Sequence, residues 1–367
     1  MPVRDAGLLT PEASGNKTLA GIDDSLSATQ PRPEGFKSLM GRFFADAVHP
    51  LKGFFAQMRA DAPENPFSLG GKKSYVPRLG EVVWQAKEAS PFHAYIFKTR
   101  DGRKVGFIRI ADYGGGREEV EAFGRIMARF QKQTDALVID QVSNPGGAVF
   151  YLYALVSHLS DKPMTAPKHR IIADESDAMW AVDFLEKVDN PMFRMLGQLD
   201  SGDEWAGYPV TARFWELMKQ FARFILSELG AGRRLTGLTH LWGADSIDPA
   251  PDAAQRYTKP ILLLTNELDF SGGDFFQAIL QDNGRATILG VRTSGAGGAV
   301  KGYNLPNQFG IDDLSATWTI AQRANGEPIE NLGVKPDIVY ELTQKDFRTG
   351  FAEYRRAILK TLAGLLK

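Results

Sequence analysis

A serine beside two glycines is the first feature of this sequence that could do chemistry. The apolar run over residues 260–265 predicts a buried strand, and Ser271 follows at the point where the pattern predicts a helix over 272–281. A helix N-terminus carries unsatisfied N–H groups and the positive end of the helix dipole, which would stabilise an oxyanion on an acyl group held by Ser271. Ser271 is therefore a candidate nucleophile for acyl transfer. The alternative is a serine that only caps the helix.

A second turn could supply the matching hydrogen-bond donors. Asn144, Pro145, Gly146 and Gly147 follow another apolar run over 136–140. Glycine N–H groups at the carboxyl edge of a sheet are free to point into the same crevice as Ser271. Gly147, or alternatively Gly146, is one candidate oxyanion donor and Gly272 is the other. A tight turn without a chemical role is the alternative interpretation.

The composition excludes several other kinds of site. The 367 residues include no cysteine, which rules out disulfides, thiolate nucleophiles and cysteine-based zinc sites. Lys and Arg number 43 against 44 Asp and Glu, and no basic block is present, so nucleic acid is not an expected partner. No apolar stretch reaches the length of a membrane span or of a signal peptide. We expect no cofactor and no metal.

The elements that must position these residues follow an α/β pattern. Short β-rich runs over 105–110, 136–140, 260–265 and 287–291 alternate with helical patterns over 149–159 and 272–281. A further helical stripe is formed by Val120, Phe123, Ile126, Met127 and Phe130. Nearly continuous apolar strands joined through helices predict a parallel sheet that is covered on both faces.

The chain divides by composition into three parts. Residues 1–40 are rich in Gly, Ser, Thr and Pro and predict a poorly ordered tail or linker, and 41–92 predict a helical or irregular connecting segment. Residues 93–367 form the predicted catalytic domain, with a helical insertion at about 165–255. The clearest helix of the insertion begins with Thr211 as its cap and ends at Gly230. It either packs against the core or lines a substrate cleft.

Two blocks of this sequence resemble a known family. They read TDALVIDQVSNPGGAVFYLYALVSHLSDKP and YTKPILLLTNELDFSGGDFFQAILQDNGRATILGVRTSGAGG. They are similar to the two sequence blocks of the carboxyl-terminal-processing, or tail-specific, serine peptidase superfamily. Shorter runs, YIFK at 95–98, APKHR at 166–170 and ENLGV at 330–334, place the resemblance nearest to the branch of the chlamydial protease-like activity factor. The resemblance covers residues 75–367, the C-terminal portion of such a protein, and implies a crotonase-like spiral of βα units.

The resemblance also implies roles for single residues. Ser271 matches the nucleophile, and Glu330 matches the glutamate that orients a histidine in the tricorn and chlamydial branch, although without the resemblance Glu330 would be a solvated turn residue. The tail-specific branch uses a lysine in the next loop as its base. Ala296 stands at that position here, and Lys301 lies too far along to replace it, so a Ser–Lys pair is not expected.

The family's histidine has no match in this chain. It lies upstream of the first matched block, where the only histidine is His49, in a context, AVHPLKG, that does not resemble the family's. His158 and His169 are expected to be structural, His240 falls in the insertion, and the resemblance implies that the position of His93 need not be a histidine. We therefore expect an N-terminally incomplete protein: a fragment, a wrongly placed start, or a chain whose histidine lies on an upstream partner segment. Purified alone, it should hydrolyse peptides little or not at all.

The expected function is that of a serine endopeptidase acting on a polypeptide substrate through an acyl-enzyme on Ser271. The alternatives are an inactive pseudo-peptidase or a binding module on the same fold, as in interphotoreceptor retinoid-binding protein, and a crotonase-type acyl-thioester enzyme. The resemblance implies a secreted or periplasmic location and leaves a homodimer open.

Overall fold

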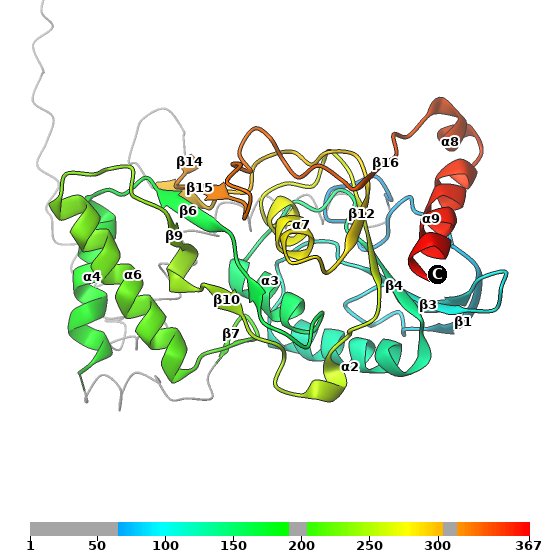
Figure 1. The fold of residues 1–367 in the computed structure, drawn as a ribbon, viewed down its shortest axis with the longest axis horizontal. Coiled ribbons are helices and arrows are strands. Elements are labelled where there is room, and N and C mark those ends of the chain that lie inside the picture. Colours follow the sequence, from blue (N-terminus) through cyan, green and yellow to red (C-terminus); the bar gives the residue numbers. More distant parts are fainter. Residues whose placement is uncertain (1–64, 191–203, 304–313) are drawn as a thin grey trace, which may run out of the picture.

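The computed structural model describes residues 65–190, 204–303 and 314–367 (Figure 1). The predicted tail over 1–40, and the part of the connecting segment up to residue 64, lie outside the described residues. His49 lies outside them as well.

The centre of the molecule is a seven-stranded sheet in the order β1-β2-β3-β4-β11-β12-β16. From β3 to β16 neighbouring strands are parallel, whereas β1, β2 and β3 pair antiparallel. The bounds are β1 (Glu81–Gln85), β2 (Ala94–Lys98), β3 (Lys104–Arg109), β4 (Ala136–Asp140), β11 (Ile261–Thr265), β12 (Thr287–Gly290) and β16 (Ile338–Val339). The mixed α/β class and the strands predicted near 105–110, 136–140, 260–265 and 287–291 are confirmed.

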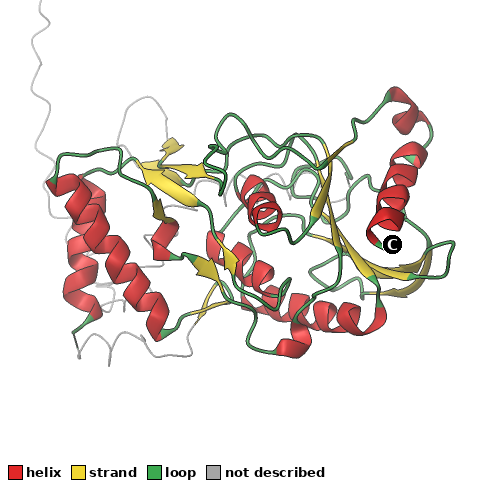
Figure 2. Cartoon of the chain, in the orientation of Figure 1, coloured by secondary structure: helices red, strands yellow, loops and turns green. Residues whose placement is uncertain are grey.

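Helices cover both faces of this sheet (Figure 2). On one face lie α2 (Arg117–Gln133), α3 (Val149–Ser157) and α7 (Gly272–Asp282), packed on alternate strand residues such as Leu137 and Ile139. On the other face α9 (Ala352–Leu365), preceded by α8 (Gln344–Arg348), packs on the intervening residues such as Val138 and Leu262. Both sides of the strands are thus apolar, which explains their nearly continuous apolar runs.

The segment between the two halves of the sheet contains helices and short strands. Its main helices, α4 (Glu175–Val188) and α6 (Ala212–Gly230), pack on each other at the left of Figure 1. The predicted helix start is confirmed, because the Thr211 side chain accepts a hydrogen bond from the Phe214 N–H at 3.2 Å. The short elements are β5 (Met164–Thr165), β6 (Lys168–Ile171), β7 (Glu204–Trp205), β8 (Tyr208–Pro209), β9 (Thr239–His240), η1 (Leu241–Gly243), β10 (Ser246–Ile247) and η2 (Ala253–Gln255).

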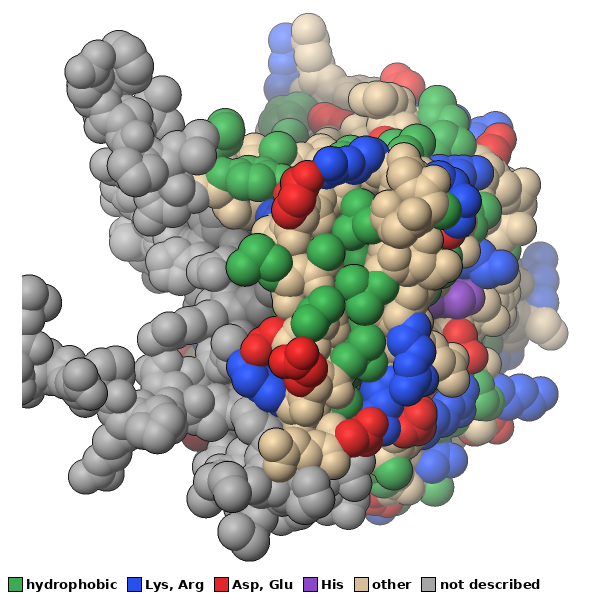
Figure 3. Space-filling view, turned by 90° about the vertical axis from the view of Figure 1, so that its left-hand side faces the viewer, with side chains coloured by type: hydrophobic (Ala, Val, Ile, Leu, Met, Phe, Trp, Pro, Cys, Tyr) green, Lys and Arg blue, Asp and Glu red, His purple; other side chains and the backbone are tan. Residues whose placement is uncertain are grey.

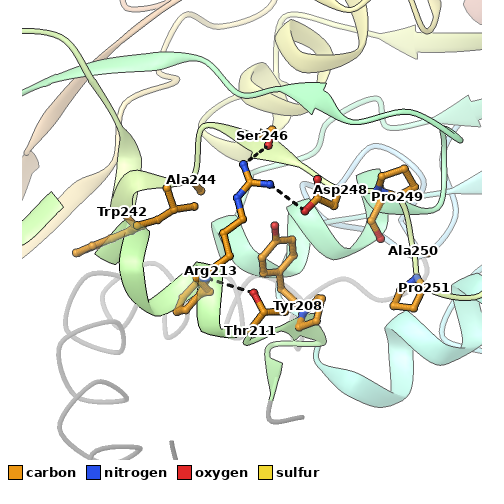
Figure 4. A pocket seen from close by; sticks show the side chains of 14 residues that line it. Tyr208, Thr211, Arg213, Trp242, Ala244, Ser246, Asp248, Pro249, Ala250 and Pro251 are labelled. Carbon is orange, nitrogen blue, oxygen red and sulfur yellow. Dashed lines mark hydrogen bonds and ion pairs between the residues drawn. The ribbon is translucent and has the colours of Figure 1, made fainter. Parts of the chain in front are cut away.

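A small three-stranded sheet joins this segment to the C-terminal part of the chain. It has the order β15-β6-β9, with β15 at Thr319–Gln322, and a separate hairpin pairs β13 (Val300–Tyr303) with β14 (Leu314–Thr317). At the start of α6, Arg213 donates to Asp245 at 3.0 Å and to Ser246 at 3.2 Å and pairs with Asp248 (Figure 4). These contacts fix α6 to the segment around β10.

The surface of the α4 and α6 region carries apolar side chains (Figure 3). Met179 of α4 is 73% exposed, and Val182, Ile172 and Leu235 are exposed as well. Within the ranges that the structure describes, no helix is long and apolar enough to cross a membrane.

Candidate active site

Ser271 lies at the N-terminus of α7, where the sequence predicts it. Its side chain makes no capping hydrogen bond, so it does not serve as the helix cap. The backbone is at φ 53° and ψ −118°, a region that non-glycine residues seldom adopt and that costs about 1–3 kcal/mol. Ser271 is partly exposed, whereas Gly272 and Gly273 beside it are buried. The hydroxyl is thus held at a strained turn at the carboxyl edge of the sheet and is not used to stabilise the helix.

Hydrogen bonds join the turn that contains Gly146 and Gly147 to the loop before Ser271. The Asn144 N–H donates to the Asp269 carboxylate at 2.9 Å, and the Phe270 N–H donates to the Asn144 carbonyl at 3.1 Å. Burial raises the pKa of the Asp269 carboxyl to about 8, against the opposing effect of the hydrogen bonds it accepts. The two loops therefore form one rigid unit around Ser271.

Of the two glycines in that turn, Gly147 is the one whose N–H has no acceptor among the described residues. The Gly146 N–H donates to the Asn144 side chain at 2.8 Å, whereas no acceptor is found among the described residues for the N–H groups of Gly147 and Gly272. These two amides lie close together, because a β-carbon built on Gly272 would be 3.2 Å from the Gly147 nitrogen. The turn thus brings two unsatisfied donors to the start of α7, as an oxyanion site requires.

A small cavity of about 60 Å³ opens beside Ser271. Its walls are mostly apolar and come from α3, α7, the segment around η1 and the loop after β12. The residues are Gly147, Val149, Leu152, His169, Leu241, Ser271, Gly272, Phe275, Gly297, Gly298 and Ala299. An acyl group bonded to Ser271 would place its neighbouring side chain against these apolar walls.

Asp274, in the first turn of α7, fixes the loop that holds Ala296. Its buried carboxylate accepts hydrogen bonds from the Gly295 N–H and the Ala296 N–H, each at 2.9 Å, and from the Thr293 hydroxyl. Lys301 lies outside this loop, because its ammonium pairs with Asp174 at 2.9 Å and Asp177 at 3.1 Å. The expectation that Lys301 does not replace the missing lysine agrees with this geometry.

Glu330 lies in a turn that packs against the same loop. A β-carbon built on Gly298 would lie 2.5 Å from its Oε1 atom, which accepts a hydrogen bond from the Ala321 N–H at 3.0 Å. Its Oε2 atom is buried and has no hydrogen-bond partner among the residues that the structure describes. Burial raises the pKa of this carboxyl. A solvated turn residue would have neither property, whereas a carboxylate placed to receive a donor from a further group would have both.

None of the four histidines in the described ranges bonds to Ser271 or Glu330. His158 Nδ1 forms a hydrogen bond with the Gln255 carbonyl at 3.1 Å. His93 directly precedes β2, and His240 is the last residue of β9. His169 differs from the other three histidines in that it lines the cavity beside Ser271. Its Nδ1 atom bonds to the Thr319 hydroxyl at 2.9 Å, and burial lowers its pKa to about 3.

Sequence reasoning missed Asp274, Asp269 and His169. A signal existed for the two aspartates, because each is an acidic residue close to the apolar strand over 261–264 or the apolar positions of the helix after Ser271. No pattern in the sequence indicates that β6 brings His169 to the wall of the cavity.

Comparisons with known proteins identify the family of this chain. Residues 104–340 match peptidase family S41. An uncharacterized protein of Chlamydia muridarum is 38% identical over 99% of this chain, which covers 64% of that relative, and a Chlamydia trachomatis protein is 37% identical over 85% of this chain and 55% of its own length. The chain thus spans about half to two thirds of the curated relatives it matches.

Solved structures extend the likeness to three dimensions. The crystal structure of mature CPAF is 38% identical, covers 83% of this chain and 60% of that one, and superposes with a TM-score of 0.74. Mature CPAF complexed with lactacystin gives 38% identity and a TM-score of 0.73 over 84% and 62% of the two chains. Because the residues that match the family span more than half of the sequence, from β3 to β16, and include the Ser271 turn and Glu330, the chain belongs to peptidase family S41.

Proposed function

We propose that this chain is the C-terminal catalytic portion of a serine endopeptidase, with Ser271 as nucleophile and Glu330 as the residue that orients a histidine. The observation that carries the proposal is the buried Oε2 atom of Glu330, which has no hydrogen-bond partner within 65–190, 204–303 and 314–367. A buried carboxylate oxygen without a donor is costly, and an imidazole N–H would satisfy it. No imidazole reaches this atom within the described residues, and we propose that a segment upstream of them supplies the histidine.

The reaction follows from the positions of the groups. The Ser271 oxygen attacks the scissile carbonyl carbon and passes its proton to the histidine, whose imidazolium Glu330 stabilises. The N–H groups of Gly147 and Gly272 donate to the oxyanion of the tetrahedral intermediate. The intermediate collapses when the leaving amine takes the proton from the histidine, and water then hydrolyses the acyl-enzyme by the same steps.

The test is peptide hydrolysis by this chain with and without a source of the histidine. We would use a fluorogenic peptide library and add, in trans, the part of the Chlamydia muridarum relative that this chain does not match. The chain alone should show little turnover, because removal of a triad histidine costs several orders of magnitude in rate. With the added segment, turnover should appear, and Glu330→Gln should reduce it. Gln at that position keeps the size but not the charge.

Two outcomes would change the proposal. Robust cleavage by the chain alone that is lost in His49→Ala would place the base on His49. No cleavage under any condition, with Ser271 unreactive, would favour a pseudo-peptidase or a binding module instead.

Three further proposals rest on the same family resemblance. We propose that the βα units form a crotonase-like spiral, that the protein acts in a secreted or periplasmic location, and that it forms a homodimer. Fractionation with a reporter fusion would test the location, and sedimentation velocity would test the dimer.

A further inference from the structure

A second and larger cavity, of about 490 Å³, lies at the carboxyl edge of the central sheet. The cavity is lined by residues of the loops that follow the parallel strands β4, β11, β12 and β16, among them Ser143, Asn266, Val291 and Tyr340. The cavity shares no lining residue with the one beside Ser271. In open α/β sheets this edge is where ligands bind.

Aromatic side chains form much of the wall. Phe67 stacks on Tyr75 at 5.5 Å between ring centres and on Phe347 at 6.2 Å, and Tyr340 lies 5.0 Å from Tyr354. Phe67 and Phe347 are 47% and 57% exposed, although each has ring partners on this wall. Partly exposed aromatic rings around a cavity offer faces on which a ligand can pack.

The charged groups of the lining are all of one sign. Glu267 and Glu341 are its only ionisable acids, and the lining contains no Lys, Arg or His. Both carboxylates are exposed, and neither has an ion-pair or hydrogen-bond partner within the part of the chain that the structure describes. The cavity therefore combines unpaired negative charge with exposed aromatic faces.

The floor of the cavity is held by hydrogen bonds. The Asn266 side-chain N–H donates to the Ser143 hydroxyl at 3.0 Å and to the Tyr75 hydroxyl at 3.4 Å. The Ser143 backbone N–H donates back to the Asn266 side-chain oxygen, Oδ1, at 2.8 Å. These bonds connect the loops after β4 and β11. The cavity is thus formed before any ligand binds, which lowers the entropic cost of binding.

We propose that this cavity binds a positively charged segment of a polypeptide, with a Lys or Arg side chain between the aromatic walls and Glu267 and Glu341. A cation over an aromatic face gains electrostatic energy, and the apolar stem of either side chain can pack on the rings. The two free carboxylates then receive the charged head. The site is separate from the Ser271 chemistry, so its test does not depend on the proposed function.

The experiment is a binding titration in the full chain with Ser271→Ala, which prevents turnover. A fluorescein-labelled peptide of alternating Arg and Gly is followed by anisotropy, beside a peptide of equal length in which norleucine replaces Arg. The Glu267→Gln/Glu341→Gln double variant tests the carboxylates. The control is Glu118→Gln/Glu186→Gln, two exposed glutamates on α2 and α4 whose loss changes the net charge equally. Phe347→Ala tests the aromatic wall.

We expect saturable binding of the Arg peptide that weakens about tenfold in the Glu267/Glu341 double variant and stays unchanged in the control. Phe347→Ala should weaken it as well, while circular dichroism reports that the fold is retained. Three results would overturn the proposal: no saturable binding at millimolar peptide, equal weakening in the control variant, or equal binding of the norleucine peptide.

Discussion

Acid should lower the free energy of unfolding through His169, which is only 1% exposed. Burial lowers the pKa of this imidazole from 6.5 to about 3, with a smaller effect from His240. The folded protein therefore holds His169 neutral where the unfolded chain binds a proton. The stability that this group contributes is complete above the unfolded pKa of 6.5 and is lost as the pH falls toward 3.

The size of the effect follows from the two pKa values. Each pH unit within the window costs about 1.4 kcal/mol, so at about pH 5 the loss is about 2 kcal/mol relative to neutral pH. The perturbation is His169→Asn, which removes the titration but leaves an amide that can bond to the Thr319 hydroxyl. The smaller side chain will cost some stability at every pH, and that cost should not depend on pH.

The assay is urea unfolding of the chain and the variant at about pH 7.5 and about pH 5, followed by tryptophan fluorescence. Between the higher and the lower pH, the unmodified chain should lose about 2 kcal/mol more free energy of unfolding than His169→Asn loses. A difference that stays constant between the two pH values would refute the argument that His169 is held neutral by burial. The pKa values of His93, His158 and His240 are also lowered by burial, but these groups titrate in both proteins and cancel.

Three substitutions test the other parts of the site. Gly147→Ala should abolish labelling of Ser271 by a fluorophosphonate probe or unfold the chain, because the new β-carbon would lie 2.4 Å from the Tyr113 backbone at a φ of 145°. Thermal melting separates the two outcomes. Unchanged melting together with unchanged labelling would contradict the placement of Gly147. Asp274→Asn should lower the free energy of unfolding by about 1–3 kcal/mol, measured in urea, because the amide cannot accept both loop N–H groups; an unchanged value would show that the loop is held otherwise. Lys301→Met should lower the free energy of unfolding, measured in urea, by about 3 kcal/mol, because it leaves the buried Asp177 carboxylate without its cation. Labelling of Ser271 in the folded variant should be unchanged. Lost labelling would give Lys301 a direct role.

The long apolar elements could be predicted from the sequence, because burial on both faces leaves a pattern that does not depend on distant residues. The strand over Ala136–Asp140 agrees with its predicted bounds, and the start of α7 after Ser271 agrees as well. Strands of two to four residues, such as β6 and β9, have too few positions to show a period, and they pair with partners far along the chain.

The candidate site could be predicted only in part. The Ser271 position follows from the helix start, but its φ of 53° and the choice between the Gly146 and Gly147 amides depend on hydrogen bonds that only the folded chain makes. Glu330 likewise accepts an N–H from Ala321 of β15 on its Oε1 atom, while its Oε2 atom has no partner among the described residues. Such features depend on tertiary contacts, for which the local sequence carries no pattern.

The most direct test of the central claim is the site of covalent labelling by a fluorophosphonate probe. The chain is mixed with the part of the Chlamydia muridarum relative that this chain does not match, treated with the probe and digested, and the modified peptide is sequenced by mass spectrometry. The account predicts one adduct, on Ser271, that is absent from Ser271→Ala and retained in a Ser294→Ala control on the neighbouring loop. An adduct on another serine, with Ser271 unmodified, would contradict the account.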